Sequence, residues 1–295
     1  MGKLLDLINS SAPLVSDGAW GTAMIERGLH PGECPDLWSI DHYSDVVDIA
    51  RSYLDAGSQM VETNSFGANS CKLSHFGLSD KAIEINEAAA RASKEAAGSN
   101  HLVLGSMGPS GKLLLMGEIS EDEMFNVFSE QAAALERGGA DAICIETMSD
   151  LDEASIAVRA AKESTKLDVI CTFTFEKTVQ GDFRTMMGID PITAATEIVK
   201  VGADIAGTNC GNGMERMAEI IKEMKTVVPD TPLLVHANAG LPHFENGRDI
   251  YPETPSQMAE FARLVLENGA QIIGGCCGTT PEHIKAIAEV AKAFK

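Results

Sequence analysis

Four junctions along the chain repeat one local pattern, and this repeat limits the possible fold more than any other feature of the sequence. The segments read DAGSQMVETN, RGGADAICIET, KVGADIAGTNC and ENGAQIIGGCC. In each of them a glycine ends a helical stretch, a small polar link follows, and a short apolar run begins. The four glycines are Gly57, Gly139, Gly202 and Gly269.

Short apolar runs alternate with helical stretches along the whole chain. Eight runs occur, at Leu14–Val15, Met60–Val61, Leu102–Leu104, Ala142–Ile145, Val169–Phe173, Ile205–Ala206, Leu233–Val235 and Ile272–Ile273. The repeat glycines precede the second, fourth, sixth and eighth runs. Strands that alternate with helices predict parallel βα units, and a repeat on alternate strands is typical of a barrel. The sequence therefore predicts an α/β fold, a (β/α)8 TIM barrel, as one domain over residues 1–295.

Capping signals place several helix boundaries. Ser120 and Glu123 have the spacing of a capping box, and Gly98 is a typical residue after a helix end. Thr280 and Pro281 predict the start of another helix. The loops RGLHPGECPD and GLPHFENGRDIYPETP are expected to be surface insertions of the barrel.

Charge and hydropathy exclude several classes of partner. The formal net charge is −20 and no basic cluster offsets it, so neither nucleic acid nor an anionic membrane surface is an expected partner. No apolar run approaches the ~20 residues that cross a bilayer. An aspartate interrupts the apolar part of MGKLLDLINSSAP, so a signal peptide is not expected there.

The chain has seven cysteines at wide spacings, and the odd number favours reduced thiols in a cytoplasm. Cys144 and Cys171 lie inside apolar runs, and we expect them to be small buried hydrophobic residues.

Polar residues follow the predicted strands at one fixed distance. Seven and eight residues after the repeat glycines stand Asn64 and Ser65, Glu146 and Thr147, Asn209 and Cys210, and Cys276 and Cys277. Asp17 and Asn238 follow the first and seventh strands in the same way. Because the active site of a (β/α)8 barrel lies at the carboxyl ends of its strands, we expect these side chains to meet at one mouth.

The segment GGCCGTTPEH, residues 274–283, places two thiols side by side between glycines. Neighbouring residues of a straight strand point to opposite faces, so Cys276 and Cys277 can reach one target only if the backbone turns there. Cys210 approaches the same mouth. Three thiolates are typical zinc ligands, and three protein ligands with one open position are typical of a catalytic zinc site.

Two other interpretations of these cysteines stay open at this point. Cys276 and Cys277 could form a vicinal disulfide or act as a redox dithiol, and the zinc site could be purely structural. No short CxxC pair is present to decide between them.

The motifs DGAWGTAM, ETNSFGAN, GSMGPSG, IETMSD, GTNCG, HANAG and GGCCGTTPEHI together resemble the homocysteine S-methyltransferase family. Within it the chain is most similar to the homocysteine-binding module of cobalamin-dependent methionine synthases. The resemblance covers the sequence from about Leu14 onward. It implies a zinc-dependent barrel in which Cys210, Cys276 and Cys277 are the zinc thiolates.

The resemblance also implies how the substrate is bound. Asp17 and Glu146 are expected to hold the ammonium group of homocysteine, and Asn238 to occupy the open zinc position when homocysteine is absent. A glycine-rich loop can bind an anion through its N–H groups, so the loop at residues 107–111, marked by Ser110, is expected to hold the substrate carboxylate. His236 is expected in the core or behind the ligands, and the role of Glu62 stays open.

The expected reaction is methyl transfer to sulfur, which gives methionine. A coordinated thiol is deprotonated, so its sulfur can attack an electrophilic methyl group directly. Gly278 stands where relatives that use sulfonium donors tend to carry arginine, and no D-x-H-x-x-G cobalamin motif is present. The resemblance therefore favours methylcobalamin on a separate corrinoid protein as the donor.

Several other functions stay open. S-methylmethionine or S-adenosylmethionine could be the methyl donor, and another small thiol could be the acceptor. A thiol-disulfide oxidoreductase and a non-catalytic zinc- or thiol-binding module are the alternatives from other classes.

Overall fold

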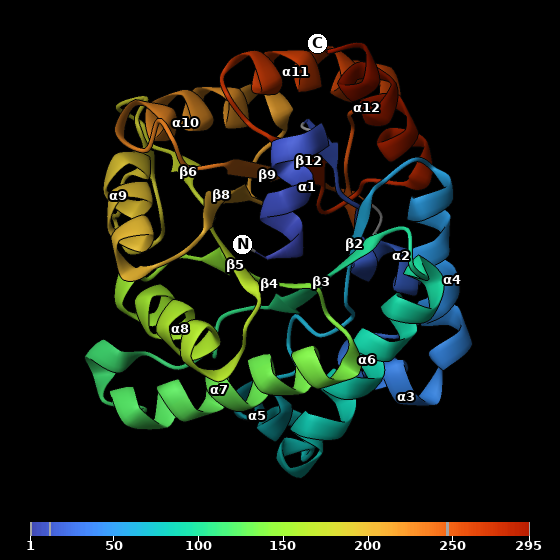
Figure 1. Ribbon diagram of the computed structural model, residues 1–295, viewed down its shortest axis with the longest axis vertical. Helices are drawn as coiled ribbons and strands as arrows, with labels where there is room; N and C mark the ends of the chain where they lie inside the picture. The colour runs from blue at the N-terminus through green and yellow to red at the C-terminus, as the bar shows by residue number, and fades with distance from the viewer. Residues whose placement is uncertain (1, 12, 246–247, 295) are drawn as a thin grey trace.

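The computed structural model describes residues 2–11, 13–245 and 248–294. Eight parallel strands form one sheet in the order β1-β12-β9-β8-β5-β4-β3-β2, which is the order of the chain around a barrel. Strands β1 and β2 are joined by Gln59, whose N–H donates to the carbonyl oxygen of Val15 at 2.8 Å and whose side chain accepts from the Val15 N–H at 2.7 Å. The helices surround this barrel (Figure 1).

The strands of the barrel are β1 (Leu14–Val15), β2 (Met60–Glu62), β3 (Leu102–Met107), β4 (Ala142–Met148), β5 (Asp168–Phe173), β8 (Ile205–Asn209), β9 (Leu233–Ala237) and β12 (Ile272–Gly275). The α-helices are α1 (Lys3–Ser11), α2 (Trp20–Glu26), α3 (Trp38–Asp41), α4 (Tyr43–Asp55), α5 (Ser70–Leu73), α6 (Ala82–Ala97), α7 (Glu121–Gly138), α8 (Leu151–Ser164), α9 (Pro191–Val201), α10 (Met214–Val227), α11 (Pro255–Glu267) and α12 (Pro281–Ala293). Short 3-10 turns occupy Pro35–Leu37, Ser74–Phe76, Ser79–Lys81 and Leu114–Met116.

The predicted barrel is confirmed, and each of the eight apolar runs lies in one of its strands. The repeat glycines share one backbone conformation, with φ of 110° at Gly57, 111° at Gly139, 119° at Gly202 and 103° at Gly269. Only glycine adopts this left-handed region without strain, so the repeated residue is the one that lets each helix turn back into its strand. The predicted capping box at Ser120 is present, and α12 begins at Pro281 directly after Thr280, as predicted.

The barrel interior is closed at the amino ends of the strands by α1, which lies at the centre of the ring in Figure 1. Leu4 and Ile8 pack there with strand residues such as Leu14 and Met60. The N–H groups of Leu4 and Leu5 donate to the carboxylate of Asp168 at 3.0 and 3.1 Å. Since this end is plugged, the carboxyl ends of the strands are left as the open mouth.

Two small hairpins lie in the loops after β5 and β9. They are β6–β7 (Glu176–Lys177 and Phe183–Arg184) and β10–β11 (His243–Glu245 and Arg248–Ile250). The second hairpin belongs to the segment GLPHFENGRDIYPETP, of which residues 246–247 lie outside the described part of the chain. Its described residues His243, Phe244 and Glu245 are exposed, as expected of a surface insertion.

The loop RGLHPGECPD differs from expectation. The prediction of an exposed surface insertion is wrong for the last part of this loop, because Cys34 and Asp36 are buried. The Asp36 carboxylate accepts the Gly67 N–H at 2.9 Å, which ties this loop to the one after β2. Within the described residues no helix is long and apolar enough to cross a membrane.

Candidate metal and substrate site

Three cysteines from two strand ends meet at the mouth of the barrel. Cys210 follows β8, and Cys276 and Cys277 follow β12. The Sγ atom of Cys277 lies 3.8 Å from that of Cys210 and 4.0 Å from that of Cys276. All three sulfur atoms lie within 4.8 Å of one another, and none is in a disulfide. Ligands about 2.3 Å from a tetrahedral zinc ion are about 3.8 Å apart, so the sulfur positions suit such an ion.

The backbone turns at both cysteine segments. Cys210 has a positive φ of 57°, which is unusual for a residue with a side chain, and Gly211 and Gly278 have φ of 73° and 79°. The N–H of Cys210 donates to the His236 carbonyl at 3.0 Å, and the N–H of Cys276 donates to the Ala237 carbonyl at 2.7 Å. Strand β9 therefore holds both segments, and the strained Cys210 is fixed by its neighbours.

Hydrogen bonds among the three thiols shift the pKa values of Cys276 and Cys277 in opposite directions. Hydrogen bonds from Cys210 and Cys276 lower the pKa of Cys277 to about 3, whereas hydrogen bonds with Cys210 and Cys277 raise the pKa of Cys276 well above its usual value. One thiolate is thus favoured in the absence of a cation. A bound cation of charge +2 would favour the thiolate form of all three groups.

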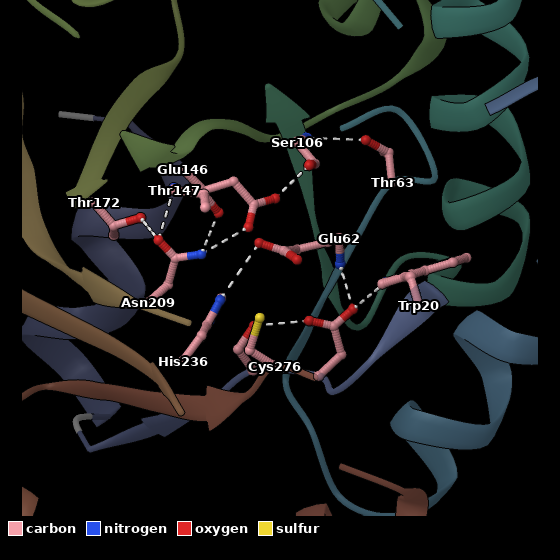
Figure 2. A network of polar contacts seen from close by, with 12 residues as sticks. Trp20, Glu62, Thr63, Ser106, Glu146, Thr147, Thr172, Asn209, His236 and Cys276 are labelled. Atoms are coloured by element: carbon pink, nitrogen blue, oxygen red, sulfur yellow. Dashed lines mark hydrogen bonds and ion pairs between the residues drawn. The ribbon is translucent and has the colours of Figure 1, made fainter. Parts of the chain in front are cut away.

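The two carboxylates that the sequence predicts at the mouth, Asp17 and Glu146, are both buried there. The Asp17 carboxylate accepts hydrogen bonds from the Trp20 indole and the Glu62 N–H, each at 2.8 Å. Glu146 accepts from the Ser106 hydroxyl, and from the side-chain amide of Asn209 at 3.2 Å (Figure 2). Burial raises the pKa of Asp17 to about 6 and that of Glu146 to about 7.

A third carboxylate, Glu62, lies at the end of β2. Burial and the charges of Glu146 and Asp17 raise its pKa well above the usual value. Its Oε1 atom is 3.5 Å from Nδ1 of His236 and has no hydrogen-bond donor among the described residues. A dashed line in Figure 2 marks this contact. Burial lowers the pKa of His236 to about 4, so the imidazole is neutral near pH 7. Asp17, Glu62 and Glu146 are three buried carboxyl groups close to one another, and such a cluster favours a cationic ligand.

Asn209 has a positioning role that sequence reasoning missed. Its side chain accepts from the Thr147 N–H and the Thr172 hydroxyl, each at 2.7 Å, while its amide donates to Glu146. The repeat places Asn209 at the mouth, but no signal in the sequence indicates that its amide links three strands. This network fixes the orientation of the Glu146 carboxylate.

One cavity of about 600 Å³ lies at this site, and Asp17 and Asn209 are not among the residues that line it. Cys210, Cys276 and Cys277 line it together with Glu62 and Glu146. Trp20 and Phe66 also contribute to its walls. A thiol cluster, an acidic surface and an aromatic wall are therefore available to one small ligand.

The two other predicted residues lie differently. Ser110 is buried, and its N–H and hydroxyl both donate to Glu153, at 2.7 and 2.5 Å, so neither donor is free for a ligand. Asn238 is buried after β9, and its Oδ1 atom has no hydrogen-bond partner among the described residues. A partnerless buried amide oxygen is costly, which is consistent with a ligand or ion nearby.

A (β/α)8 barrel with a three-cysteine cluster and buried carboxylates at its mouth is an arrangement suited to an enzyme that acts on a small ligand at a metal ion. Comparison with known proteins defines the class. Residues 14–291 match the family model of homocysteine S-methyltransferase. The chain belongs to this family.

Two methionine synthases are among its relatives. That of Mycobacterium tuberculosis (strain ATCC 25618 / H37Rv) is 32% identical over 99% of this chain, and that of Mycobacterium leprae (strain TN) is 31% identical over 96%. The matches span 26% and 25% of those proteins, so the chain corresponds to about a quarter of their length.

The fold is also that of a solved structure. The homocysteine methyltransferase MmuM from Escherichia coli, in its metallated form, superposes with a TM-score of 0.79 and 22% identity, over 97% of this chain and 99% of that one.

Proposed function

We propose that this protein methylates the sulfur of homocysteine to give methionine. The observation that carries the proposal is the meeting of three thiols within 4.8 Å of one another beside buried carboxylates in one cavity of about 600 Å³. Membership of the homocysteine S-methyltransferase family supports it. The methionine synthase relatives support the same acceptor, although the chain matches only about a quarter of each.

Zn²⁺ is the proposed cofactor, held by Cys210, Cys276 and Cys277. The spacing of the sulfur atoms and the thiolate donor set suit zinc. When bound, zinc would keep the substrate thiol deprotonated near neutral pH, where a free thiol with a pKa of about 8.5 is mostly protonated. Asn238, whose Oδ1 atom lacks a partner in the described part of the chain, is the proposed occupant of the open position before substrate binds.

Asp17 and Glu146 are the proposed partners of the substrate ammonium group. Trp20 fixes one carboxylate and Asn209 the other, so both acceptors are oriented before the substrate arrives. An ammonium between them lowers the repulsion among the buried acids and favours their ionised forms. The substrate is thereby held at its amino-acid end while its sulfur lies at the cysteine cluster.

The reaction is then a direct displacement. The substrate sulfur forms a bond to the methyl carbon, and the bond between that carbon and the donor breaks, with its electron pair leaving on the donor. We propose methylcobalamin on a separate corrinoid protein as the donor. Gly278 supports this over a sulfonium donor, because relatives that use sulfonium donors tend to carry arginine at this position. Its φ is 79° and a Cβ here would overlap the Tyr251 side chain, so arginine does not fit without rearrangement.

Methionine formation from homocysteine tests the proposal. The zinc-loaded, reduced protein is incubated with homocysteine and either methylcobalamin, S-methylmethionine or S-adenosylmethionine. Turnover with methylcobalamin supports the proposal in full. Turnover with a sulfonium only would retain the acceptor and overturn the donor.

The same assay decides against the other classes of function. Homocysteine binding without turnover with any donor would indicate a binding module. A metal-free protein that exchanges disulfides through Cys276 and Cys277 would indicate an oxidoreductase.

A further inference from the structure

The substrate carboxylate lacks an obvious partner in the site described so far. Most of the donors expected to bind it are already used, because the N–H and hydroxyl of Ser110 donate to Glu153 and the N–H of Gly108 donates to the Phe66 carbonyl at 2.9 Å. The N–H of Gly111 is left without a partner among the described residues, and it carries no full charge. The surrounding acids would repel a carboxylate. A cation elsewhere in the cavity would therefore favour binding of an amino-acid substrate.

Lys72 supplies one. It lies on α5, directly after the loop that follows β2, and it lines the same cavity as the cysteines. Among the lining residues that the structure describes, it is the only lysine or arginine. Its Nζ atom lies 4.7 Å from the centre of the Phe66 ring.

The ammonium group of Lys72 has no ionic partner among the described residues. No carboxylate in the described part of the chain lies within the 4.0 Å of an ion pair, and its Nζ makes no hydrogen bond there. Contact with an aromatic face compensates only part of the cost of removing an ammonium group from water. Burial accordingly lowers its pKa, while Asp36, Glu153 and Glu146 act on it from a distance. An anionic ligand would complete its interactions.

The side chain is held in place on both sides. Phe66 packs against Gly108, where a Cβ would come within 2.5 Å of the ring, and the Lys72 stem passes Gly111 at 3.7 Å from an added Cβ. The small residues of the loop after β3 therefore make room for the aromatic ring and the lysine stem.

We propose that Lys72 binds the α-carboxylate of the substrate, opposite the ammonium group held by Asp17 and Glu146. This inference rests on the proposed function and deepens it. The site then recognises a thiol, an ammonium group and a carboxylate at three separate points, and it selects an amino-acid thiol over a simple amine thiol.

The test compares two thiols and two substitutions by calorimetric titration of the zinc-loaded protein. Homocysteine carries the carboxylate, and 3-aminopropane-1-thiol is the same molecule without it. Lys72→Met removes the charge and keeps the stem, and Lys112→Met is the matched control, since Lys112 is on the neighbouring loop but does not line the cavity.

Lys72→Met is expected to raise the Kd for homocysteine about 10- to 100-fold, as for loss of a hydrogen bond between charged groups, and to change that for 3-aminopropane-1-thiol less than about 3-fold. Lys112→Met should leave the Kd values for both thiols within about 2-fold of those of the wild type.

Equal weakening of both thiols by Lys72→Met would overturn the inference, since Lys72 would then only maintain the shape of the cavity. An unchanged Kd for homocysteine would overturn it as well. If the zinc-loaded wild-type protein does not bind homocysteine at all, the proposed function fails and this inference with it, which distinguishes the two failures.

Discussion

The Sγ atoms of Cys210 and Cys277 lie 3.8 Å apart although 67 positions separate the two residues along the chain. They are brought together because β8 and β12 both pair with β9 and end at the same face of the barrel. Two thiols at this distance and without a disulfide are placed to share a cation.

Removal of any one thiol of the cluster is expected to abolish tight zinc binding. Cys210→Ser, Cys276→Ser and Cys277→Ser each leave two sulfur ligands, and a hydroxyl is a much poorer ligand for zinc than a thiolate. Metal content after dialysis against a weak chelator measures this.

Cys71→Ser is the matched control for that experiment, because Cys71 is partly exposed and lies outside the cluster. It should keep zinc at the wild-type level. Zinc retention at the wild-type level by any of the three cluster variants would contradict the assignment of that cysteine as a ligand.

The affinity for homocysteine is expected to fall in mild acid. Asp17 and Glu146 have pKa values raised by burial to about 6 and about 7, and they must be ionised to hold an ammonium group. The kcat/KM for homocysteine should therefore decrease as the pH falls through 7 towards 6. A pH–rate profile at saturating methyl donor measures it.

Ser106→Ala should move that decrease to higher pH, since the Ser106 hydroxyl lowers the pKa of Glu146. Ser129→Ala is a suitable control, because the Ser129 hydroxyl is buried without a partner among the described residues. If Ser106→Ala does not change the pH at which kcat/KM decreases, ionisation of Glu146 does not cause the decrease.

Glu146→Gln is expected to stabilise the metal-free protein at high pH. Burial raises the pKa of Glu146 from 4.5 to about 7, so the folded chain binds this proton more tightly than the unfolded chain. The stability that protonation contributes is complete below pH 4.5 and is lost as the pH rises through 7.

The glutamine does not ionise, so the variant should exceed the wild type in free energy of unfolding by about 1–3 kcal/mol at about pH 8 and by less at about pH 5. Urea unfolding at the two pH values measures the difference. If the gain in free energy of unfolding is the same at both pH values, packing and not ionisation is responsible for it.

Gly278→Ala is expected to destabilise the fold by about 1–3 kcal/mol, because a side chain at positive φ is strained. The added Cβ would also overlap the Tyr251 side chain. Gly28→Ala separates the two causes, since Gly28 has a φ of 109° with nothing within 4 Å of the added Cβ. If thermal unfolding shows equal losses for both variants, the contact with Tyr251 is without effect.

The barrel and the cysteine cluster are predictable from sequence because both depend on a local pattern. The glycine that ends a helix, the short strand and the polar residue at its end recur within about ten residues. This recurrence alone is enough to place Glu146, Cys210 and Cys276 at one mouth. The resemblance of the motifs predicted membership of the homocysteine S-methyltransferase family, and the match over residues 14–291 confirms that prediction.

The remaining features depend on contacts between distant segments. Ser110 is expected from its loop to face a ligand, but Glu153, which lies 43 positions away, takes both of its donors. Glu62 and His236 meet across the barrel, and Lys72 reaches the cavity from a short helix after β2. No local pattern shows which distant side chain a polar group will meet, so these contacts could not be predicted.

The most direct test of the account is X-ray absorption at the zinc edge, with and without homocysteine. The account predicts zinc bound to the sulfur atoms of Cys210, Cys276 and Cys277, and one additional sulfur ligand when homocysteine is added. A sulfur count that homocysteine leaves unchanged, or protein that holds no zinc after reduction and supplementation with the metal, would contradict it.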